Sequence, residues 1–319
     1  MIHTMFGVAF TLFASVATAV DLQGHRGARG LAPENTLPAF ARALALGVDT
    51  LELDTGVTRD GVVVIHHDLA LNPDIARDRD GKRLEKKGPP IHALTFAELQ
   101  QYDVGRLKPG TNYAERNPDQ QPVDGTRIPR LAELFAMVRD KGDQRVRFNI
   151  EIKTHPAFPD ETLAPEPFAQ ALIAEIRRAG MGGRATIQSF DWRALQAAQR
   201  IAPEVPTVYL SAQQSWFDNV GAAGPEASRW TAGFHLGEHG SVPAMVKAAG
   251  GAAWSPYYGD LDAEKMKIAK RLGLKVVVWT VNDAEAGGRM LDLGVDGIIT
   301  DRPDLMKKLV EERKRRNVP

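Results

Sequence analysis

The chain has 319 residues, of which 43% are hydrophobic and 25% charged, and this ordinary globular composition excludes a disordered or fibrous protein. Lysine plus arginine and aspartate plus glutamate both number 40, so the net charge provides no general attraction to nucleic acid or to an anionic membrane. The absence of cysteine excludes disulfides, thiolate metal sites and cysteine nucleophiles.

The N-terminal apolar run MFGVAFTLFASVATAV ends in Ala17-Thr18-Ala19, a small-x-small pattern typical of signal peptidase cleavage. We therefore expect residues 1–19 to be a signal peptide that is cleaved after Ala19. This implies a periplasmic or secreted protein with no stable membrane association after cleavage. A retained anchor or a hydrophobic element of the fold is the alternative, because no Lys or Arg precedes the run.

From residue 20 onward, short β-branched segments alternate with amphipathic ones such as LAELFAMVRD and WRALQAAQRI. This alternation, with continuous apolar strands, predicts a parallel sheet covered by helices. The predicted strands are 22–24, 50–54, 62–67, 147–153, 185–189, 207–210, 252–255, 275–281 and 297–300.

Nine strands are one too many for an eight-stranded barrel. Residues 50–57 and 62–67 are joined only by TRDG, which predicts a hairpin turn rather than a crossover helix. The second arm then folds back onto the barrel mouth and brings His67 to the end of the second strand, where barrel active sites lie. We therefore predict a (β/α)8 TIM barrel over residues 20–319.

The alternating pattern breaks down between Leu69 and Arg130, where the chain is rich in Pro, Gly, Asp and Lys. A loop of this length inside a compact domain usually has a function. We predict a small insertion at about residues 70–129 that lies over the mouth, with TFAELQ as its one helix.

Carboxylates recur at a spacing of two residues in the predicted strands. Glu52 and Asp54 in LELD share one face of their strand, as do Glu151 and Lys153 in NIEIK. Carboxylates on one inward face repel each other unless a cation or a shared proton lies between them. Three carboxylates without cysteine predict a hard oxygen-ligand site for one divalent cation, Ca²⁺ or Mg²⁺.

Two histidines lie where a barrel would carry out chemistry: His25 ends the first strand, and His67 follows VVVIH. Histidines on either side of a phosphorus centre can act as general base and general acid. Strand alternation directs only one of His66 and His67 into the site. Arg26 and Lys153 are placed to hold non-bridging phosphate oxygens.

These motifs occur together in one order: HRG at 25–27, then PENT, LELD, TRDG, HHD, NIEIK, QSFD, WTVND and GVDGIITDRP. The chain resembles the glycerophosphodiester phosphodiesterase family from about Gln23 to Pro303, as a bacterial, secreted or periplasmic type. One departure is Thr55, where the family more often has valine, and we expect this residue to face away from the site.

The resemblance implies metal-dependent hydrolysis of glycerophosphodiesters to sn-glycerol 3-phosphate and an alcohol by a phosphoric diester hydrolase of glycerol and lipid metabolism. His25 and His67 match the family's acid/base pair, Arg26 its phosphate-contacting arginine and Lys153 its lysine near the phosphate. The metal ligands match Glu52, Asp54 and Glu151. The family histidine precedes aspartate, which selects His67 over His66.

Other residues are assigned to the same pocket or to its loops. We expect Trp279 to stack on glycerol or to pack at the rim, and Gln188 and Phe190 to shape the pocket. Asp296 and Asp301, flanking the last strand, are expected to hold loops by hydrogen bonds. In PENT, the polar residues cap the following helix, and Glu34 either joins the cap or braces the turn at His25.

Two rival functions remain at this point. A phospholipase on the same barrel shares the histidines and acidic residues, and a periplasmic binding protein would take glycerophosphodiesters without hydrolysing them. The nucleophile is either water or the substrate's own glycerol hydroxyl, by way of a cyclic phosphate. The sequence leaves open the head group, the choice of ion, which histidine is the base, and the oligomeric state.

Overall fold

The computed structural model describes residues 20–221 and 228–316. The predicted signal peptide, residues 1–19, lies outside the described residues. Within the described ranges, no helix is both long enough and apolar enough to cross a membrane.

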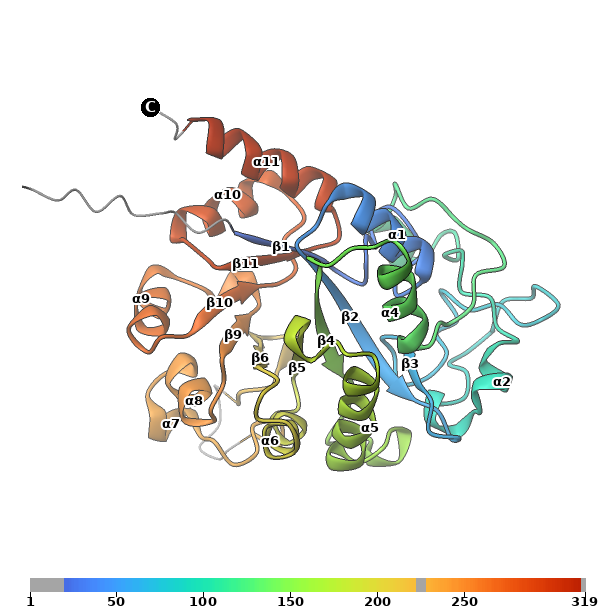
Figure 1. The fold of residues 1–319 in the computed structure, drawn as a ribbon, viewed down its shortest axis with the longest axis horizontal. Helices are drawn as coiled ribbons and strands as arrows, with labels where there is room; N and C mark the ends of the chain where they lie inside the picture. The colour runs from blue at the N-terminus through green and yellow to red at the C-terminus, as the bar shows by residue number, and fades with distance from the viewer. Residues whose placement is uncertain (1–19, 222–227, 317–319) are drawn as a thin grey trace, which may run out of the picture.

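In the described residues, eight parallel strands form a closed barrel, because β1 pairs with both β2 and β11 (Figure 1). The predicted fold is confirmed, and each predicted strand is present. The barrel strands are β1 (Asp21–Gly24), β2 (Thr50–Val57), β4 (Arg147–Ile152), β5 (Ala185–Ser189), β6 (Thr207–Ser211), β9 (Ala253–Pro256), β10 (Lys275–Val278) and β11 (Gly297–Thr300).

Helices surround this barrel (Figure 1). Their apolar residues pack with those of the strands in one core cluster. Large aromatic side chains such as Phe40, Phe135 and Trp192 fill the layer between helices and strands and are at most 1% exposed. The helices of the outer layer are α1 (Leu37–Leu46), α4 (Leu131–Asp140), α5 (Pro165–Arg178), α6 (Trp192–Ile201), α7 (Leu236–His239), α8 (Val242–Ala248), α9 (Ala263–Arg271), α10 (Ala284–Leu293) and α11 (Pro303–Arg316).

The predicted hairpin is present: β3 (Val63–Ile65) runs antiparallel to β2, with Thr55 opposite Ile65. Gly61 takes a φ of +80° in the turn, which explains why glycine occupies that position. The strand ends two residues earlier than predicted, because the backbone N–H of His66 makes the last bond to β2, on the Asp54 carbonyl oxygen (3.0 Å). His67 therefore lies just beyond the sheet, at the barrel mouth.

The segment 69–129, here called the insertion, lies on the β3 side of the barrel (Figure 1). It has a hydrophobic cluster of its own, which includes Leu71, Ile91 and Leu99. TFAELQ forms α2 (Phe96–Leu99), which Thr95 and Glu98 close with a capping box. The described residues also contain a second helix, α3 (Asn112–Glu115), so the expectation of one helix was wrong.

Several very short elements were not predicted from the sequence patterns. They are the two-residue strands β7 (Gln213–Gln214) and β8 (Phe217–Asp218) and the 3-10 turns η1 (Ile91–Ala93), η2 (Pro159–Glu161), η3 (Gly182–Arg184) and η4 (Tyr258–Asp260). The β7–β8 hairpin carries Trp216 at its tip, with 59% of that residue exposed.

Candidate active site

A pocket of about 400 Å³ opens at the carboxyl ends of the barrel strands, and every site residue predicted from the sequence lines it. These residues are His25, Arg26, Glu52, Asp54, His67, Glu151, Lys153, Gln188, Phe190 and Trp279. Arg29, Arg116 and Trp216 also line the pocket and were not predicted. The structure thus brings together groups that are up to 254 residues apart in sequence, from 25 to 279.

The three carboxylates form the buried floor of the pocket. Each of Glu52, Asp54 and Glu151 offers an oxygen within 4.8 Å of the others, because Asp54 on β2 lies opposite Glu151 on β4. Burial, followed by the charge of Asp54, raises the pKa of Glu52 well above its usual range and the pKa of Glu151 to about 8. Ionising all three carboxylates without a bound cation is therefore unfavourable, and their oxygens suit a hard divalent cation.

Asp54 is the exception within this cluster. Burial alone would raise its pKa, but the charges of Arg26, His67 and Lys153 hold the pKa well below its usual range. Lys153 lies with its Nζ 2.9 Å from Glu151 Oε1 and 3.7 Å from Asp54 Oδ1. One carboxylate of the cluster thus stays ionised without a metal and can begin to bind one.

His25 is held by Asp301, a residue predicted only to hold a loop. Its Nδ1 lies 2.5 Å from Asp301 Oδ1, and Asn282 Nδ2 donates to Asp301 Oδ2 (2.7 Å). Asp301 does hold a loop through Asn282, but it also holds the histidine, so the loop role alone was too narrow. The other ring nitrogen, Nε2, faces the carboxylates, at 3.9 Å from Glu52 Oε2.

His67 is held in the same way from the other side of the pocket. Its Nδ1 lies 2.7 Å from Asp68 Oδ1, and Asn72 Nδ2 donates to Asp68 Oδ2 (2.8 Å). Burial, with the charges of Arg26 and Lys153, lowers the pKa of His67 to about 4. His66 is buried and does not line the pocket, so the choice between the two histidines agrees with the geometry. Both pocket histidines thus use Nδ1 for a carboxylate and leave Nε2 available.

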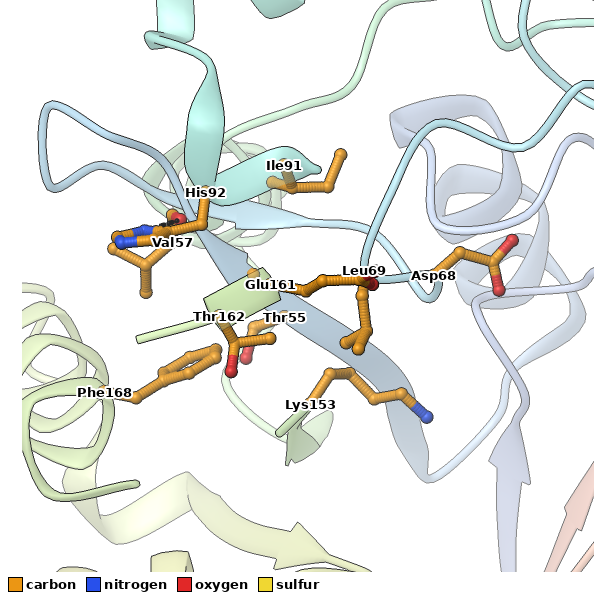
Figure 2. Close-up of a pocket in the computed structure, with 11 residues that line it drawn as sticks. Thr55, Val57, Asp68, Leu69, Ile91, His92, Lys153, Glu161, Thr162 and Phe168 are labelled. Atoms are coloured by element: carbon orange, nitrogen blue, oxygen red, sulfur yellow. Dashed lines mark hydrogen bonds between the residues drawn. The ribbon is translucent and has the colours of Figure 1, made fainter. Parts of the chain in front are cut away.

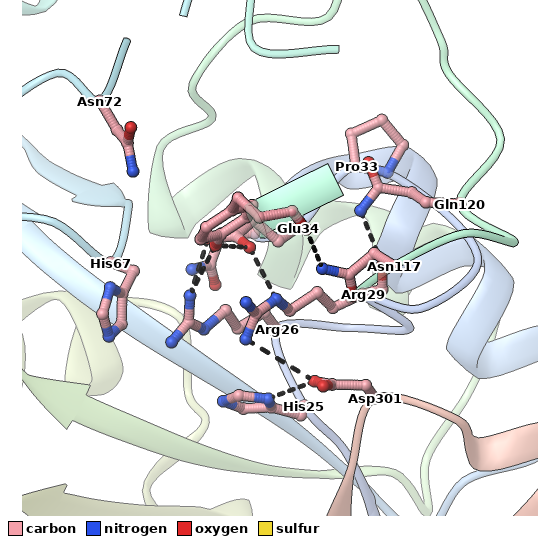
Figure 3. Close-up of polar contacts among 12 residues, drawn as sticks. His25, Arg26, Arg29, Pro33, Glu34, His67, Asn72, Asn117, Gln120 and Asp301 are labelled. Atoms are coloured by element: carbon pink, nitrogen blue, oxygen red, sulfur yellow. Dashed lines mark hydrogen bonds and ion pairs between the residues drawn. The ribbon is translucent and has the colours of Figure 1, made fainter. Parts of the chain in front are cut away.

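Arg26 is fixed by charges on several sides (Figure 3). Its Nη1 donates to Glu34 Oε1 (2.8 Å), and its Nε lies 3.1 Å from Asp54 Oδ2. The second oxygen of Glu34 pairs with Arg29 Nε (2.9 Å) and accepts a short hydrogen bond from the hydroxyl of Tyr113 in α3. Arg26 has a φ of +51°, a strained conformation for arginine that persists because these contacts determine its position.

The polar residues of PENT have two roles: one caps the helix, and the others orient groups of the pocket. Thr36 is the helix cap, since its side chain accepts from the Ala39 N–H. Glu34 braces the turn through the two arginines, and Asn35 donates from Nδ2 to Asp54 Oδ2 (2.8 Å). The motif therefore orients two groups of the pocket as well as starting α1.

Thr55 faces away from the pocket, as expected. Its hydroxyl donates to the backbone oxygen of Glu151 (2.6 Å), and it lines a separate small cleft with Leu69 and Ile91 (Figure 2). In the same view, the amino group of Lys153 points away from this packed cleft. The departure from the family pattern therefore leaves the pocket unchanged.

A buried chain of amides runs up the barrel interior to the carboxylate floor. Gln23 Nε2 donates to Asp21 Oδ2 (2.9 Å), and Asn149 Nδ2 donates to both Gln23 Oε1 (3.0 Å) and Gln188 Oε1 (2.9 Å). Gln188 Nε2 then donates to Glu52 Oε1 (2.7 Å). Barrel interiors are usually filled by branched apolar residues, so amides at these positions are unusual. Their hydrogen bonds orient the side-chain amide of Gln188 so that its NH₂ group faces Glu52.

Replacing Asn149 with aspartate is expected to weaken divalent-metal binding by about 10- to 100-fold, the usual effect of losing a partner that orients a ligand. The new carboxylate would face the oxygens of Gln23 and Gln188, and turning Gln188 over would direct its oxygen at Glu52. Calorimetric titration of the folded protein with metal measures the effect. Asn219→Asp, at a buried amide outside this chain, is the matched control. Equal metal affinity in Asn149→Asp and the unmodified protein would show that the chain does not orient Glu52.

Aromatic side chains form the opposite wall of the pocket. Phe190 and Trp279 pack edge to face with ring centroids 5.2 Å apart, and Trp279 Nε1 donates to the backbone oxygen of Ser255 (3.0 Å). Trp216 reaches the same wall from the β7–β8 hairpin, at 6.4 Å from Trp279. Carbon-bound hydrogens of a polyol can pack on such ring faces.

Residues 25–305 match the model of the glycerophosphoryl diester phosphodiesterase family. A glycerophosphodiester phosphodiesterase of Caldanaerobacter subterraneus is 30% identical over 90% of this chain and 96% of its own length. A crystal structure of a candidate glycerophosphoryl diester phosphodiesterase from Silicibacter pomeroyi is 38% identical, with a TM-score of 0.83 over 93% of this chain and 94% of that one. An Oleispira antarctica phosphodiesterase, solved with the product sn-glycerol-3-phosphate, shares the fold at 22% identity, with a TM-score of 0.65 over 91% of this chain and 96% of that one.

Proposed function

Because the chain belongs to the glycerophosphoryl diester phosphodiesterase family and is a phosphoric diester hydrolase, we propose that it hydrolyses glycerophosphodiesters to sn-glycerol 3-phosphate and an alcohol. One observation carries this proposal: two histidines, each oriented by a carboxylate, face the same three-carboxylate floor in one pocket. The complex of the Oleispira protein with sn-glycerol-3-phosphate supports this product class.

The donor set fits a divalent cation, Ca²⁺ or Mg²⁺, which Glu52, Asp54 and Glu151 would hold. Bound there, the ion would polarise the phosphodiester and offset its negative charge. Lys153 and Arg26 border the same floor and are placed to contact the non-bridging oxygens. With an ion held by the carboxylates, these two cations would place the phosphorus between the histidines.

The histidines carry the proton transfers. One Nε2 accepts the proton of the attacking oxygen, and the other Nε2 donates a proton to the leaving alkoxide. Asp301 and Asp68 each keep the Nδ1 proton in place, so the free Nε2 points at the reacting atoms. Aromatic rings on the far wall, Phe190 and Trp279 among them, are placed to pack on the glycerol carbons.

Asp301→Asn is expected to lower kcat by about 100-fold or more while KM changes little. Asn282 donates to Asp301 Oδ2, so the new amide would turn its oxygen to Asn282 and its NH₂ group to His25 Nδ1. His25 would then carry its proton on Nε2 and could not accept one there. Asp296→Asn is the control, because Asp296 accepts from the Val276 N–H at the other end of β11. Equal losses in the two variants would mean that Asp301 only stabilises its loop.

We also propose that the mature chain starts at Val20 and works in the periplasm or outside the cell. The support is the N-terminal sequence pattern, and cleavage after Ala19 would leave the barrel intact, since β1 begins at Asp21. Mass spectrometry of the protein recovered from periplasm and medium measures the N-terminus. A full-length chain that starts at Met1 would contradict the proposal.

The reaction itself is tested by ³¹P NMR of glycerophosphocholine and glycerophosphoethanolamine incubated with residues 20–319. The expected products are sn-glycerol 3-phosphate and the free alcohol. Phosphocholine plus glycerol would mean that the other ester bond is cut. No turnover by a folded, metal-loaded protein would favour a phospholipid substrate or a binding role.

A further inference from the structure

The pocket has two walls of different chemistry on opposite sides of the barrel. The strand order places β1 and β2 half a turn away from β6 and β9. Phe190 follows β5, Trp216 lies in the β7–β8 hairpin after β6, and Trp279 follows β10, so the aromatic wall is centred on β6 and β9. The other wall, near β1 and β2, is cationic and includes Arg29 and, from the insertion, Arg116.

Arg116 differs from the other cations of the pocket. Arg26 and Arg29 pair with Glu34, and Lys153 pairs with Glu151. In the ranges 20–221 and 228–316, the guanidinium of Arg116 has neither an ion pair nor a hydrogen bond, and the residue is exposed. It is therefore a full positive charge at the mouth that no carboxylate of the described chain neutralises.

The short helix α3 ends just before Arg116 and is fixed to the turn that carries Arg26 and Arg29 (Figure 3). Tyr113, in α3, donates its hydroxyl to Glu34, and the guanidinium of Arg29 lies 4.9 Å from the Tyr113 ring centre. Just beyond α3, Gln120 Nε2 donates to the backbone oxygen of Arg29 (2.7 Å). These contacts hold the backbone of Arg116 at a defined place beside the phosphate site.

We propose that Arg116 binds an anionic group on the leaving alcohol, so that the enzyme favours glycerophosphodiesters whose leaving group carries its own phosphate. This inference rests on the proposed function. If the glycerol packs on the aromatic wall and the phosphorus lies over the carboxylates, the leaving alcohol extends toward the opposite wall, where Arg116 stands. A second phosphodiester on that alcohol would meet the unpaired guanidinium, which binds phosphate oxygens well.

A pair of substrates isolates this contact. Glycerophosphoglycerol and bis(glycerophospho)glycerol share the scissile linkage and differ in the second phosphodiester on the leaving group. The ratio of their kcat/KM values is compared between proteins, which cancels the two equivalent linkages of the larger substrate. Lys86→Gln is the matched control, since Lys86 is an exposed lysine of the insertion outside the pocket.

Arg116→Gln is expected to lower the kcat/KM ratio, bis(glycerophospho)glycerol over glycerophosphoglycerol, by about five-fold, the effect of an ion pair at a solvent-accessible position. Lys86→Gln is expected to leave the ratio unchanged, and about 0.5 M salt is expected to reduce the preference of the unmodified protein. An equal loss on both substrates, or no loss, would overturn the proposal.

A binding measurement separates this proposal from the proposed function. In the His25→Ala background, calorimetry compares the affinities of the same two compounds with and without Arg116→Gln. A selective loss of affinity for bis(glycerophospho)glycerol supports the role of Arg116 even if the unmodified protein hydrolyses neither compound, a result that would refute only the proposed function. Unchanged affinities would refute the role of Arg116.

Discussion

His25→Ala is expected to lower kcat for glycerophosphodiester hydrolysis by about 10²- to 10⁴-fold, the usual contribution of a positioned acid or base. The imidazole is held by Asp301 at Nδ1 and directs Nε2 toward the carboxylate floor, so alanine removes the proton carrier without removing a carboxylate. His67→Ala is expected to act similarly, because Asp68 holds its ring in the same way. Steady-state kinetics with glycerophosphocholine measures both effects.

The neighbouring histidine provides the control for this prediction. His66 is buried beside His67 but does not line the pocket, so His66→Ala changes stability rather than the chemistry of the folded fraction. The kinetics are therefore normalised to the folded protein, measured by circular dichroism. If His66→Ala lost as much activity as His67→Ala, the assignment of His67 would be wrong.

Glu52→Gln is expected to weaken metal binding by more than about 100-fold and to abolish turnover at ordinary metal concentrations. Glutamine keeps the shape but removes one of three carboxylates within 4.8 Å, and ligand charge is what sets affinity at such sites. The loss exceeds the range expected for a residue that merely orients a ligand. Calorimetric titration with Ca²⁺ and Mg²⁺ measures the affinity.

The same variant should change the stability of the metal-free protein in the opposite direction. The fold raises the pKa of Glu52, so at pH values above its unfolded pKa the metal-free fold must either protonate Glu52 or bury its charge, and both cost stability. Removing that charge should raise the Tm without metal. The unmodified protein gains about 2.7 kcal/mol from metal at 100 times its Kd, and the variant should lose this gain. A metal-induced Tm rise that survives Glu52→Gln would place the ion elsewhere.

The barrel could be predicted because the sequence patterns that indicate it are local and recur along the chain. Each strand is a short β-branched run, and the spacing of Glu52 and Asp54 on one strand fixes a shared face. The turn TRDG distinguished β3 from the parallel strands and correctly brought His67 to the mouth. The β7–β8 hairpin was missed because two-residue strands carry no measurable periodicity. Helix α3 is as short as α2, but it lacks the capping box that marks the start of α2.

The missed residues of the pocket depend on contacts between distant segments. Asp301 lies 276 positions from His25, but barrel closure puts the end of β11 beside the end of β1, so the aspartate of TDRP could have been assigned to the histidine. Tyr113 and Arg116 had no such signal, because the conformation of the insertion follows from its own packing rather than from a repeated pattern. The sequence also gave no reason to connect Asn149 with Glu52.

Metal-dependent release of sn-glycerol 3-phosphate from glycerophosphocholine by residues 20–319 most directly tests the role of the carboxylate floor. The protein is assayed after treatment with EDTA, and then with Ca²⁺ and Mg²⁺ added back separately. No release is expected after EDTA, release is expected to return with one of the two ions, and no ion is expected to restore it in Glu52→Gln. Full activity in the metal-free protein would contradict the role of the carboxylate floor as a metal site.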